Sequence, residues 1–214
     1  MIKADNRETR IEAAKLIERG GILAFRTDTF YGLGVDPLNA LAVRRIRELK
    51  GREEVKPILL LISDRADVER FVTTQSHAFR RVADRFWPGA LTLVGVARPE
   101  LPVELTGGTE TIGVRLPDDE RVRSLVRACG GALTATSANL SRQMPARSAA
   151  EVQNYFPTVV DLIIDGGEVT VTEPSTVLDL SGNEPRLVRE GAIKRDHLLD
   201  FLPAMRKPQA VEAP

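Results

Sequence analysis

Residues 22–34, ILAFRTDTFYGLG, place a short apolar run directly before a polar turn and two closely spaced glycines. The run Ile22–Phe25 predicts a buried strand, and the turn after it holds short hydroxyl groups and one carboxylate. Open α/β sheets bind ligands just beyond the ends of their strands, so Thr29 and its neighbours are candidates for holding a small polar molecule. The same residues could equally form a polar connection with ordinary turn glycines.

Helical patterns flank this stretch on both sides. Apolar residues recur every three or four positions over 6–19, and the helix that they predict ends at Gly20 and Gly21. Asn39 is a residue type that caps helices, and the pattern after it predicts a second helix that ends near Lys50. The rest of the pattern predicts a helical region over 64–86, in one or two pieces, and a helix over 118–128. It predicts strands over 58–62, 91–96, 111–116, 132–135, 162–164, 176–180 and 186–188.

This mixture of strands and helices indicates the α/β class. Several strands follow one another without a helix between them, so a regular βαβ alternation is not expected. We expect instead a single domain over residues 1–202, built on a twisted, mixed, open β-sheet with flanking helices. Residues 203–214 contain three prolines and are expected to form a flexible tail.

The composition is that of a globular protein and disfavours several classes of site. Of 214 residues, 43% are hydrophobic, and 30 lysines and arginines balance 30 aspartates and glutamates. One cysteine excludes an internal disulfide, and two histidines supply a zinc site or a Ser-His-Asp triad poorly. The sequence has neither an apolar run of the roughly 18 residues that a membrane span needs nor an N-terminal signal-peptide core. We therefore expect a cytoplasmic protein that does not enter a membrane.

A cluster of cations follows the second predicted helix. Lys50, Arg52 and Lys56 lie within the sequence KGREEVKP, where they could clamp a triphosphate: lysine supplies a point charge and arginine a fork for two oxygens. The alternative is a solvated charge run, because two glutamates nearly cancel the three cations. The GxxxxGK[ST] pattern is absent, which disfavours a P-loop kinase or GTPase.

Hydroxyl-rich residues follow a later predicted strand, in the sequence TATSANLS. Ser137 and Asn139 there could belong to a donor-rich cradle for phosphate, or they could cap a helix. Thr111 and Arg115 lie four residues apart on one predicted strand, so their side chains share a face. Arg115 could bind a substrate carboxylate or pair with a nearby acid of the protein.

Seven short motifs occur in a fixed order along the chain: TDTFYGLG, KGR…KP, PGALTLV, IGVRLP, TSANLS, STV and RxGAI. Each motif is weak alone, but the ordered set resembles the YrdC-like threonylcarbamoyl-adenylate synthases. The resemblance extends from about Gly20 to Ile193, nearly the whole chain. Because the sequence ends soon afterwards, we expect the short form of the family, without the additional C-terminal domain that some relatives carry.

The resemblance implies a deep, positively charged cavity at the twisted sheet and a role for each candidate residue. It assigns the ATP phosphates and nucleotide to Lys50, Arg52, Lys56, Thr111, Ser137, Asn139 and Arg189, with Lys50 and Arg52 as the catalytic cations. It assigns L-threonine to Thr29, Arg115 and Ser175, with Arg115 facing the threonine carboxylate.

The implied reaction condenses L-threonine, bicarbonate or CO₂, and ATP to threonylcarbamoyl-AMP and pyrophosphate. A separate transferase would pass the threonylcarbamoyl group to adenosine in tRNA. No protein nucleophile is needed, and catalysis would come from aligning the substrates and neutralising phosphate charge, with Mg²⁺ bridging the phosphates and no dedicated protein metal site.

Three residues depart from the family pattern. Arg26 stands where proline is common, Leu61 where some relatives have a polar residue, and Arg142 where glycine usually follows SANLS. The first two bear on amino-acid selectivity and the third on nucleotide binding.

Two other functions compete with this one. One alternative is a non-catalytic RNA-binding module, although aromatic residues make up only 5% of the chain. The other is a paralogue that makes a carbamoyl-adenylate for another acceptor.

Overall fold

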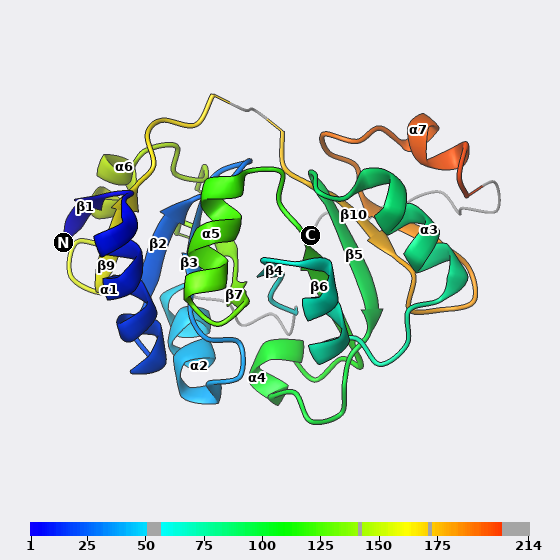
Figure 1. Cartoon of the computed structure of the whole chain (residues 1–214), viewed down its shortest axis with the longest axis horizontal. Helices are drawn as coiled ribbons and strands as arrows, with labels where there is room; N and C mark the ends of the chain where they lie inside the picture. Colours follow the sequence, from blue (N-terminus) through cyan, green and yellow to red (C-terminus); the bar gives the residue numbers. More distant parts are fainter. Residues whose placement is uncertain (51–56, 141–142, 171–172, 203–214) are drawn as a thin grey trace.

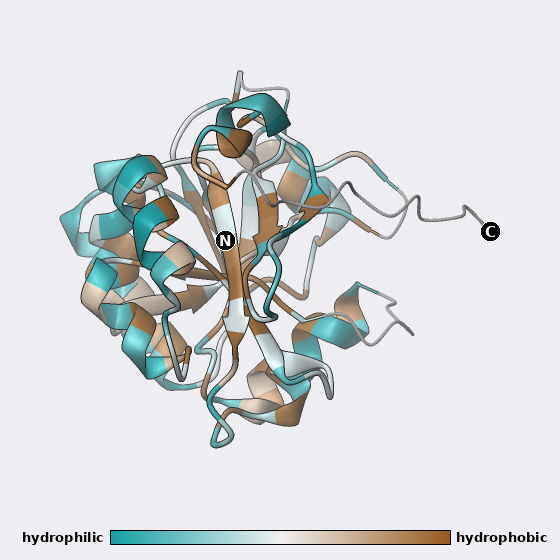
Figure 2. Ribbon diagram, turned by 90° about the vertical axis from the view of Figure 1, so that its right-hand side faces the viewer, coloured by the Kyte–Doolittle hydropathy of each residue, from teal (hydrophilic) through white to brown (hydrophobic). Residues whose placement is uncertain are grey.

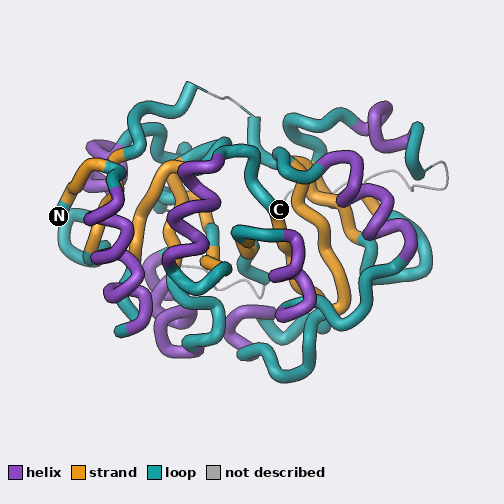
Figure 3. Tube along the Cα trace, viewed as in Figure 1, coloured by secondary structure: helices purple, strands orange, loops and turns teal. Residues whose placement is uncertain are grey.

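The computed structural model describes residues 1–50, 57–140, 143–170 and 173–202. Within these ranges the strands form two hydrogen-bonded sheets that stand side by side, with helices around them (Figure 1 and Figure 3). The five-stranded sheet has the order β1 (Ile2–Ala4), β9 (Leu162–Asp165), β2 (Leu23–Arg26), β3 (Tyr31–Gly34) and β8 (Thr136–Ser137). The six-stranded sheet has the order β11 (Arg186–Arg189), β10 (Thr176–Asp179), β5 (Leu91–Val96), β6 (Thr111–Arg115), β4 (Leu60–Ile62) and β7 (Ala132–Thr134).

Both sheets are mixed. Strand β2 runs parallel to β9 and antiparallel to β3, while β10 runs parallel to β5 and antiparallel to β11. The described helices are α1 (Arg7–Glu18), α2 (Ala40–Leu49), α3 (His77–Phe86), α4 (Val103–Thr106), α5 (Glu120–Ala128), α6 (Ala149–Tyr155), α7 (Arg195–Leu199) and a 3₁₀ helix, η1 (Arg65–Arg70). The predicted α/β class is confirmed, and the strands divide between two sheets.

Side-chain caps fix the start of the two predicted N-terminal helices. The Asn6 side chain accepts the N–H of Thr9 at 2.9 Å, and the Asn39 side chain accepts the N–H of Ala42 at 3.1 Å. Each bond satisfies a backbone donor that has no partner inside the helix. The predicted helices at 6–19 and after Asn39 are thereby confirmed.

The side chains of β4 alternate between two apolar clusters that lie on opposite sides of the strand. Leu60 and Ile62 belong to the larger cluster, which includes residues of α2, α3 and α6, whereas Leu61 belongs to the smaller one. Successive strand residues point to opposite faces, so the clusters lie on the two sides of this strand. Helices α1 and α5 cover the smaller cluster side by side, with hydrophilic residues on their outer surfaces (Figure 1 and Figure 2).

The two sheets are joined where β7 leads into β8. The N–H of Thr134 donates to the carbonyl of Val35 at 3.1 Å, and the N–H of Ala135 donates to the carbonyl of Leu59 at 2.7 Å. Val35 in turn donates its N–H to the Thr134 hydroxyl at 2.9 Å. One segment therefore contacts both sheets, and it leads directly into the TSANLS motif.

Several short elements were not predicted from the sequence. Strand β3 consists of the YGLG stretch, whose glycines have low strand propensity, and its pairing with β2 and β8 holds it extended. The helical pattern over 64–86, for which one or two pieces were expected, forms two, η1 and α3, and between them Val72 pairs with Ala97, the residue after β5. Residues 203–214, expected to be a flexible tail, lie outside the described residues.

None of the described helices combines the length and the apolar character that crossing a bilayer requires.

Close packing at the sheet junction predicts that Gly34 tolerates no side chain. A Cβ atom there would lie 2.7 Å from Cε1 of Phe25 and 3.0 Å from the carbonyl oxygen of Thr134. Gly34→Ala should therefore lower the free energy of unfolding by about 1–3 kcal/mol, measured by urea denaturation. Gly182→Ala is the matched control, because a Cβ there has no atom within 4 Å. Equal stability of the two variants would contradict the packing argument.

Candidate functional site

A row of polar side chains lies at one end of the six-stranded sheet. Arg189 of β11 is in register with Val177 of β10, which is in register with Thr92 of β5. Extending the β5–β6 register by one residue places Thr92 beside Arg115, the last residue of β6. Ser175 immediately precedes β10. Three predicted site residues, Arg115, Ser175 and Arg189, are thus brought together by the strand order.

Arg115 is the buried charge of this row, with only 2% of its surface exposed. Its Nη2 donates to Oδ1 of Asp28 at 2.6 Å and lies 3.4 Å from Oγ1 of Thr29. Burial lowers the pKa of the Arg115 guanidinium, and the Asp28 carboxylate raises it. The Nε of Arg115 is buried and has no hydrogen-bond partner among the described residues, so one donor remains for a ligand.

The turn at residues 27–29 is held by one hydroxyl group. Oγ1 of Thr27 donates to the carbonyl of Phe30 at 2.6 Å and accepts the N–H groups of Thr29 and Phe30 at 3.1 and 3.2 Å. The Thr29 hydroxyl lies 3.1 Å from the same oxygen atom and faces Arg115. The turn therefore presents the Thr29 hydroxyl to the buried guanidinium.

Arg189 reaches the same end of the sheet from β11. Its Nε and Nη2 donate to the carbonyl of Ser175 at 3.1 and 2.9 Å, and Nη2 also donates to the Ser175 hydroxyl at 3.2 Å. That hydroxyl lies 3.0 Å from the Thr92 hydroxyl. Burial lowers the pKa of Arg189, and the positive charge of Arg115 lowers it further. Two nearby guanidinium groups make this region attractive to anions.

A second cluster surrounds Lys50, at the C-terminal end of α2. The Lys50 ammonium is buried and donates to the carbonyls of Ser137 and Asn139 at 2.6 and 2.7 Å and to the Asn139 side-chain oxygen at 2.6 Å. The Ser137 hydroxyl donates to the same amide oxygen at 2.6 Å. Three predicted nucleotide-binding residues are therefore in direct contact, and Lys50 also ties α2 to the segment after β8.

The two clusters border on the same turn. Gly32 of β3 pairs with Ser137 of β8, so Ser137 lies one strand away from the segment that carries Thr29. A Cβ atom at Gly32 would lie 3.6 Å from Cγ2 of Thr27 and 3.5 Å from the carbonyl of Thr136. The turn at 27–29 thus contacts Arg115 on one side and approaches the TSANLS segment on the other.

Some predicted site residues are not brought into either cluster. Thr111 begins β6 while Arg115 ends it, so the two lie roughly 13 Å apart along the strand. The Thr111 hydroxyl lies 3.2 Å from that of Thr109. Arg52, Lys56 and Arg142 lie outside the described residues. The deep basic cavity stays a prediction, since two of its three expected phosphate-binding cations belong to the 51–56 segment.

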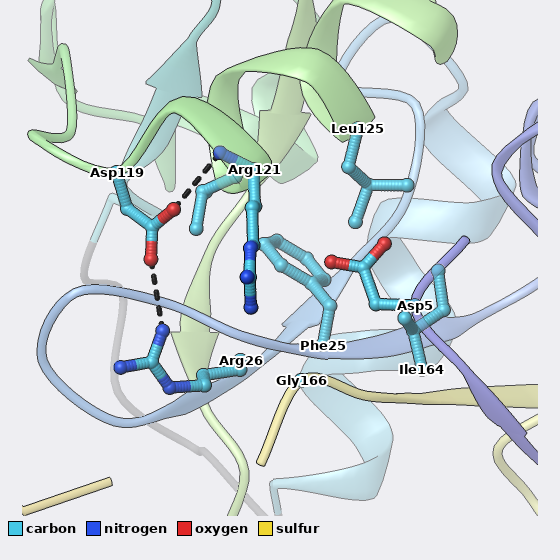
Figure 4. A pocket seen from close by; sticks show the side chains of 9 residues that line it. Asp5, Phe25, Arg26, Asp119, Arg121, Leu125, Ile164 and Gly166 are labelled. Carbon is cyan, nitrogen blue, oxygen red and sulfur yellow. Dashed lines mark hydrogen bonds and ion pairs between the residues drawn. The ribbon is translucent and has the colours of Figure 1, made fainter. Parts of the chain in front are cut away.

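Two of the three residues that depart from the motif pattern, Leu61 and Arg26, lie among the described residues. Leu61 is in register with Arg115 but is fully buried in the apolar cluster under α1 and α5. The guanidinium of Arg26 donates through Nη1 to Oδ2 of Asp119 at 2.8 Å, beside a small hollow that is also lined by Phe25 (Figure 4). Arg26 thus bonds to the start of α5.

Two residues near Arg115, one in the row and one in the 27–29 turn, did not appear among the predicted site residues. Thr92 is a buried hydroxyl in an otherwise apolar strand, an exception to the pattern that could have drawn attention to it. Asp28 was recognised as a carboxylate in a candidate ligand turn, but its partner could not be identified. Its contact with Arg115 joins residues 87 positions apart, and such pairings leave no local signal.

Known proteins resemble this chain in sequence and in fold. The family model Sua5_yciO_yrdC, described as telomere recombination, matches residues 15–191. A threonylcarbamoyl-AMP synthase of Pyrococcus abyssi is 36% identical over 93% of this chain, and the match spans 58% of that relative's length. The enzyme of the same name from Thiobacillus denitrificans is 41% identical over 77% of this chain and 87% of its own.

Solved structures agree with this similarity. The crystal structure of P. abyssi Sua5 complexed with L-threonine superposes with a TM-score of 0.92 at 33% identity, over 100% of this chain and 63% of that protein. E. coli YciO superposes with a TM-score of 0.79 at 26% identity, over 91% of this chain and 95% of its own. The chain therefore spans less than two thirds of the archaeal protein and nearly all of YciO.

The contacts of Lys50 predict that its charge stabilises the fold. Lys50→Met removes an ammonium that links the end of α2 to the segment after β8, and charged hydrogen bonds contribute about 1.5–3 kcal/mol each. We expect the free energy of unfolding to fall by about 2–3 kcal/mol in urea denaturation. Lys15→Met, at an exposed position of α1, is the control. A loss at Lys50 that only matches the control would show that the buried ammonium is not structural.

Proposed function

The chain belongs to the Sua5/YciO/YrdC family, and on that premise we propose that it condenses L-threonine, bicarbonate and ATP to L-threonylcarbamoyl-AMP and pyrophosphate. The product would serve the threonylcarbamoyladenosine modification of tRNA. Two relatives that are named threonylcarbamoyl-AMP synthase, at 36% and 41% identity, support this proposal.

One observation carries the proposal: a buried guanidinium with an unpartnered Nε, beside the hydroxyl of Thr29. Arg115 provides the charge and the Thr29 hydroxyl lies 3.4 Å from its Nη2, while the Ser175 hydroxyl accepts from Arg189 at the same end of the sheet. An amino-acid carboxylate matches the arginine fork, because two parallel N–H···O bonds can form. The threonine hydroxyl can bond to a neighbouring protein hydroxyl. A small hydroxylated amino acid therefore suits this end of the sheet.

The nucleotide would lie on the other side of the turn, toward Lys50. Ser137 and Asn139 offer polar groups beside a buried ammonium, and Arg52 and Lys56 would complete the phosphate clamp from the segment that follows α2. Arg189, which bonds to Ser175, would approach the nucleotide from the amino-acid side. Thr111 is the weakest of the proposed nucleotide contacts, since it lies at the far end of β6.

The proposed chemistry needs positioning more than it needs a reactive side chain. Bicarbonate takes up a proton and loses water to give CO₂; the threonine amine then adds to CO₂ and loses a proton, which gives a carbamate. A carbamate oxygen then attacks the α-phosphorus of ATP, and the bond to the β-phosphate oxygen breaks as pyrophosphate leaves. The cations of this chain would neutralise charge that develops on the phosphates. The turn at 27–29 would hold the amino acid for in-line attack.

We propose that Mg²⁺ accompanies the triphosphate, because it neutralises phosphate charge and prefers oxygen ligands. The side-chain oxygens beside Lys50 are already engaged, because the Asn139 amide oxygen accepts from both the Lys50 ammonium and the Ser137 hydroxyl. No group of three or more His, Cys, Asp and Glu side chains that could hold a metal occurs among the described residues. Phosphate oxygens and water would therefore supply most of the ligands.

The product is a reactive mixed anhydride, so its use requires a transferase that accepts it promptly. We propose such a tRNA-modifying enzyme as the downstream partner, in the cytoplasm, where ATP and tRNA are both available.

Two competing functions are distinguished by simple assays. A non-catalytic RNA-binding module would bind structured RNA in a salt-sensitive manner without releasing pyrophosphate. A paralogue with another acceptor would release pyrophosphate with a different substrate in place of threonine. Threonine-dependent pyrophosphate release therefore separates the proposed function from both alternatives, and release with another substrate in place of threonine separates the paralogue from the RNA-binding module.

We predict that ATP, bicarbonate and labelled threonine give threonylcarbamoyl-AMP, detected by mass analysis of the short-lived product. Arg115→Lys should raise the KM for threonine at least about tenfold, equivalent to about 1.4 kcal/mol, because lysine keeps the charge but loses the fork. Arg127→Lys, an exposed position of α5, is the control. An unchanged threonine KM in a folded Arg115→Lys variant would refute the assignment of the carboxylate site.

A second prediction concerns the phosphate side. Arg52→Ala should lower the turnover rate at least about tenfold, which corresponds to about 1.4 kcal/mol of barrier, because one of the proposed phosphate-binding cations is lost. Lys50→Ala should lose at least as much, in addition to its effect on stability. Glu53→Ala, which changes a neighbouring charge of opposite sign, is the control. Wild-type turnover by a folded Lys50→Ala/Arg52→Ala protein would refute the phosphate clamp.

A further inference from the structure

Two segments that are distant in the sequence exchange charged contacts reciprocally. The β2 end and its turn, residues 26–29, provide Arg26 and Asp28, and the segment from the end of β6 to the start of α5 provides Arg115 and Asp119. Arg115 donates to Asp28 at 2.6 Å, and Arg26 donates to Asp119 at 2.8 Å. Each segment therefore contributes one cation and one carboxylate, and two ion pairs cross-link them.

The two ion pairs lie in different environments. The inner pair is nearly dry, with side chains 3% and 14% exposed, whereas the outer pair is 29% and 21% exposed. The inner pair includes the guanidinium proposed to bind the threonine carboxylate. An incoming carboxylate must share Arg115 with Asp28 or displace it. Binding of the proposed substrate would therefore weaken the inner link between the segments and leave the outer link intact.

The outer pair is well anchored on both sides. Oδ1 of Asp119 accepts the N–H of Arg121 at 2.9 Å, so the carboxylate that binds Arg26 also caps α5 (Figure 4). On the other side, the Arg26 side chain packs over Gly166, where an added Cβ would lie 2.9 Å from that of Arg26. Arg26 is one residue away from Thr27, whose hydroxyl organises the whole turn.

We infer that the Arg26–Asp119 ion pair positions the 27–29 turn for the amino-acid substrate when that substrate engages Arg115. Arg26 is a positioning residue: it acts through Thr27 and Thr29 and does not touch the substrate. This inference rests on the proposed function, and it gives a role to the arginine that stands where relatives often have proline.

A double-mutant cycle tests the pair, using Arg26→Gln, Asp119→Asn and the double variant. Asparagine can still cap α5, so Asp119→Asn removes the charge and keeps the helix start. Each single variant should raise the KM for threonine about three- to five-fold, the effect of a partly exposed ion pair, and leave the KM for ATP unchanged. The double variant should resemble either single variant, because both remove the same interaction.

Two further variants separate positioning from general effects of charge or stability. Arg121→Gln removes a neighbouring positive charge beside the same hollow and should leave the threonine KM unchanged. Arg26→Lys keeps a cation and should restore the KM to within about twofold of wild type. Two results would overturn the inference. One is a threonine KM in Arg26→Gln and Asp119→Asn that equals that of Arg121→Gln. The other is a KM increase in the double variant that equals the product of the two single increases.

Hydrogen exchange tests the positioning step without turnover. The amides of Thr29 and Phe30 both donate to the Thr27 hydroxyl, so their protection reports on the turn. Arg26→Gln should reduce that protection about three- to five-fold, and unchanged protection would overturn the inference. If the wild-type protein releases no threonine-dependent pyrophosphate while protection still falls in Arg26→Gln, the proposed function fails and the turn-holding role of the ion pair stands.

Discussion

The burial of one charge, the guanidinium of Arg115, is the constraint on which the site depends. Removing an ion from water is costly unless nearby groups compensate it, and here Asp28 and the Thr29 hydroxyl do so. Those partners can reach Arg115 only if β2 ends in a tight polar turn and β6 ends at the same level as its neighbouring strands. The sheet order and the conformation of the turn are therefore tied to the compensation of one charge.

The same principle operates at the other cluster. The Lys50 ammonium is buried among oxygen atoms of Ser137 and Asn139, and it fixes the end of α2 to the segment that passes between the two sheets. Both clusters border on the 27–29 turn, so an amino acid near Arg115 and a nucleotide near Lys50 would approach each other there. Close packing of Gly34 against Phe25 and Thr134 keeps the sheets close enough for this arrangement.

Local patterns in the sequence predict the elements that local chemistry determines. The helix over 6–19, the cap at Asn39 and the apolar run of β5 were identified correctly, because each signal lies within a few residues. Strand β3 and the division into two sheets escaped prediction, since both depend on pairings between distant segments. The site residues show the same limit: the ordered motifs suggested Arg115 and Ser175, but the contacts with Asp28 and Thr92 join segments that no local pattern relates.

Calorimetric titration with L-threonine and with L-threoninamide tests the role of the buried guanidinium most directly. The two ligands share the hydroxyl and amine, but only threonine has the carboxylate that the Arg115 fork would hold. Threonine should bind at least about tenfold more tightly, a difference of about 1.4 kcal/mol. Equal affinities would contradict the assignment of Arg115 as the carboxylate-binding residue, and with it the organisation of the site around that charge.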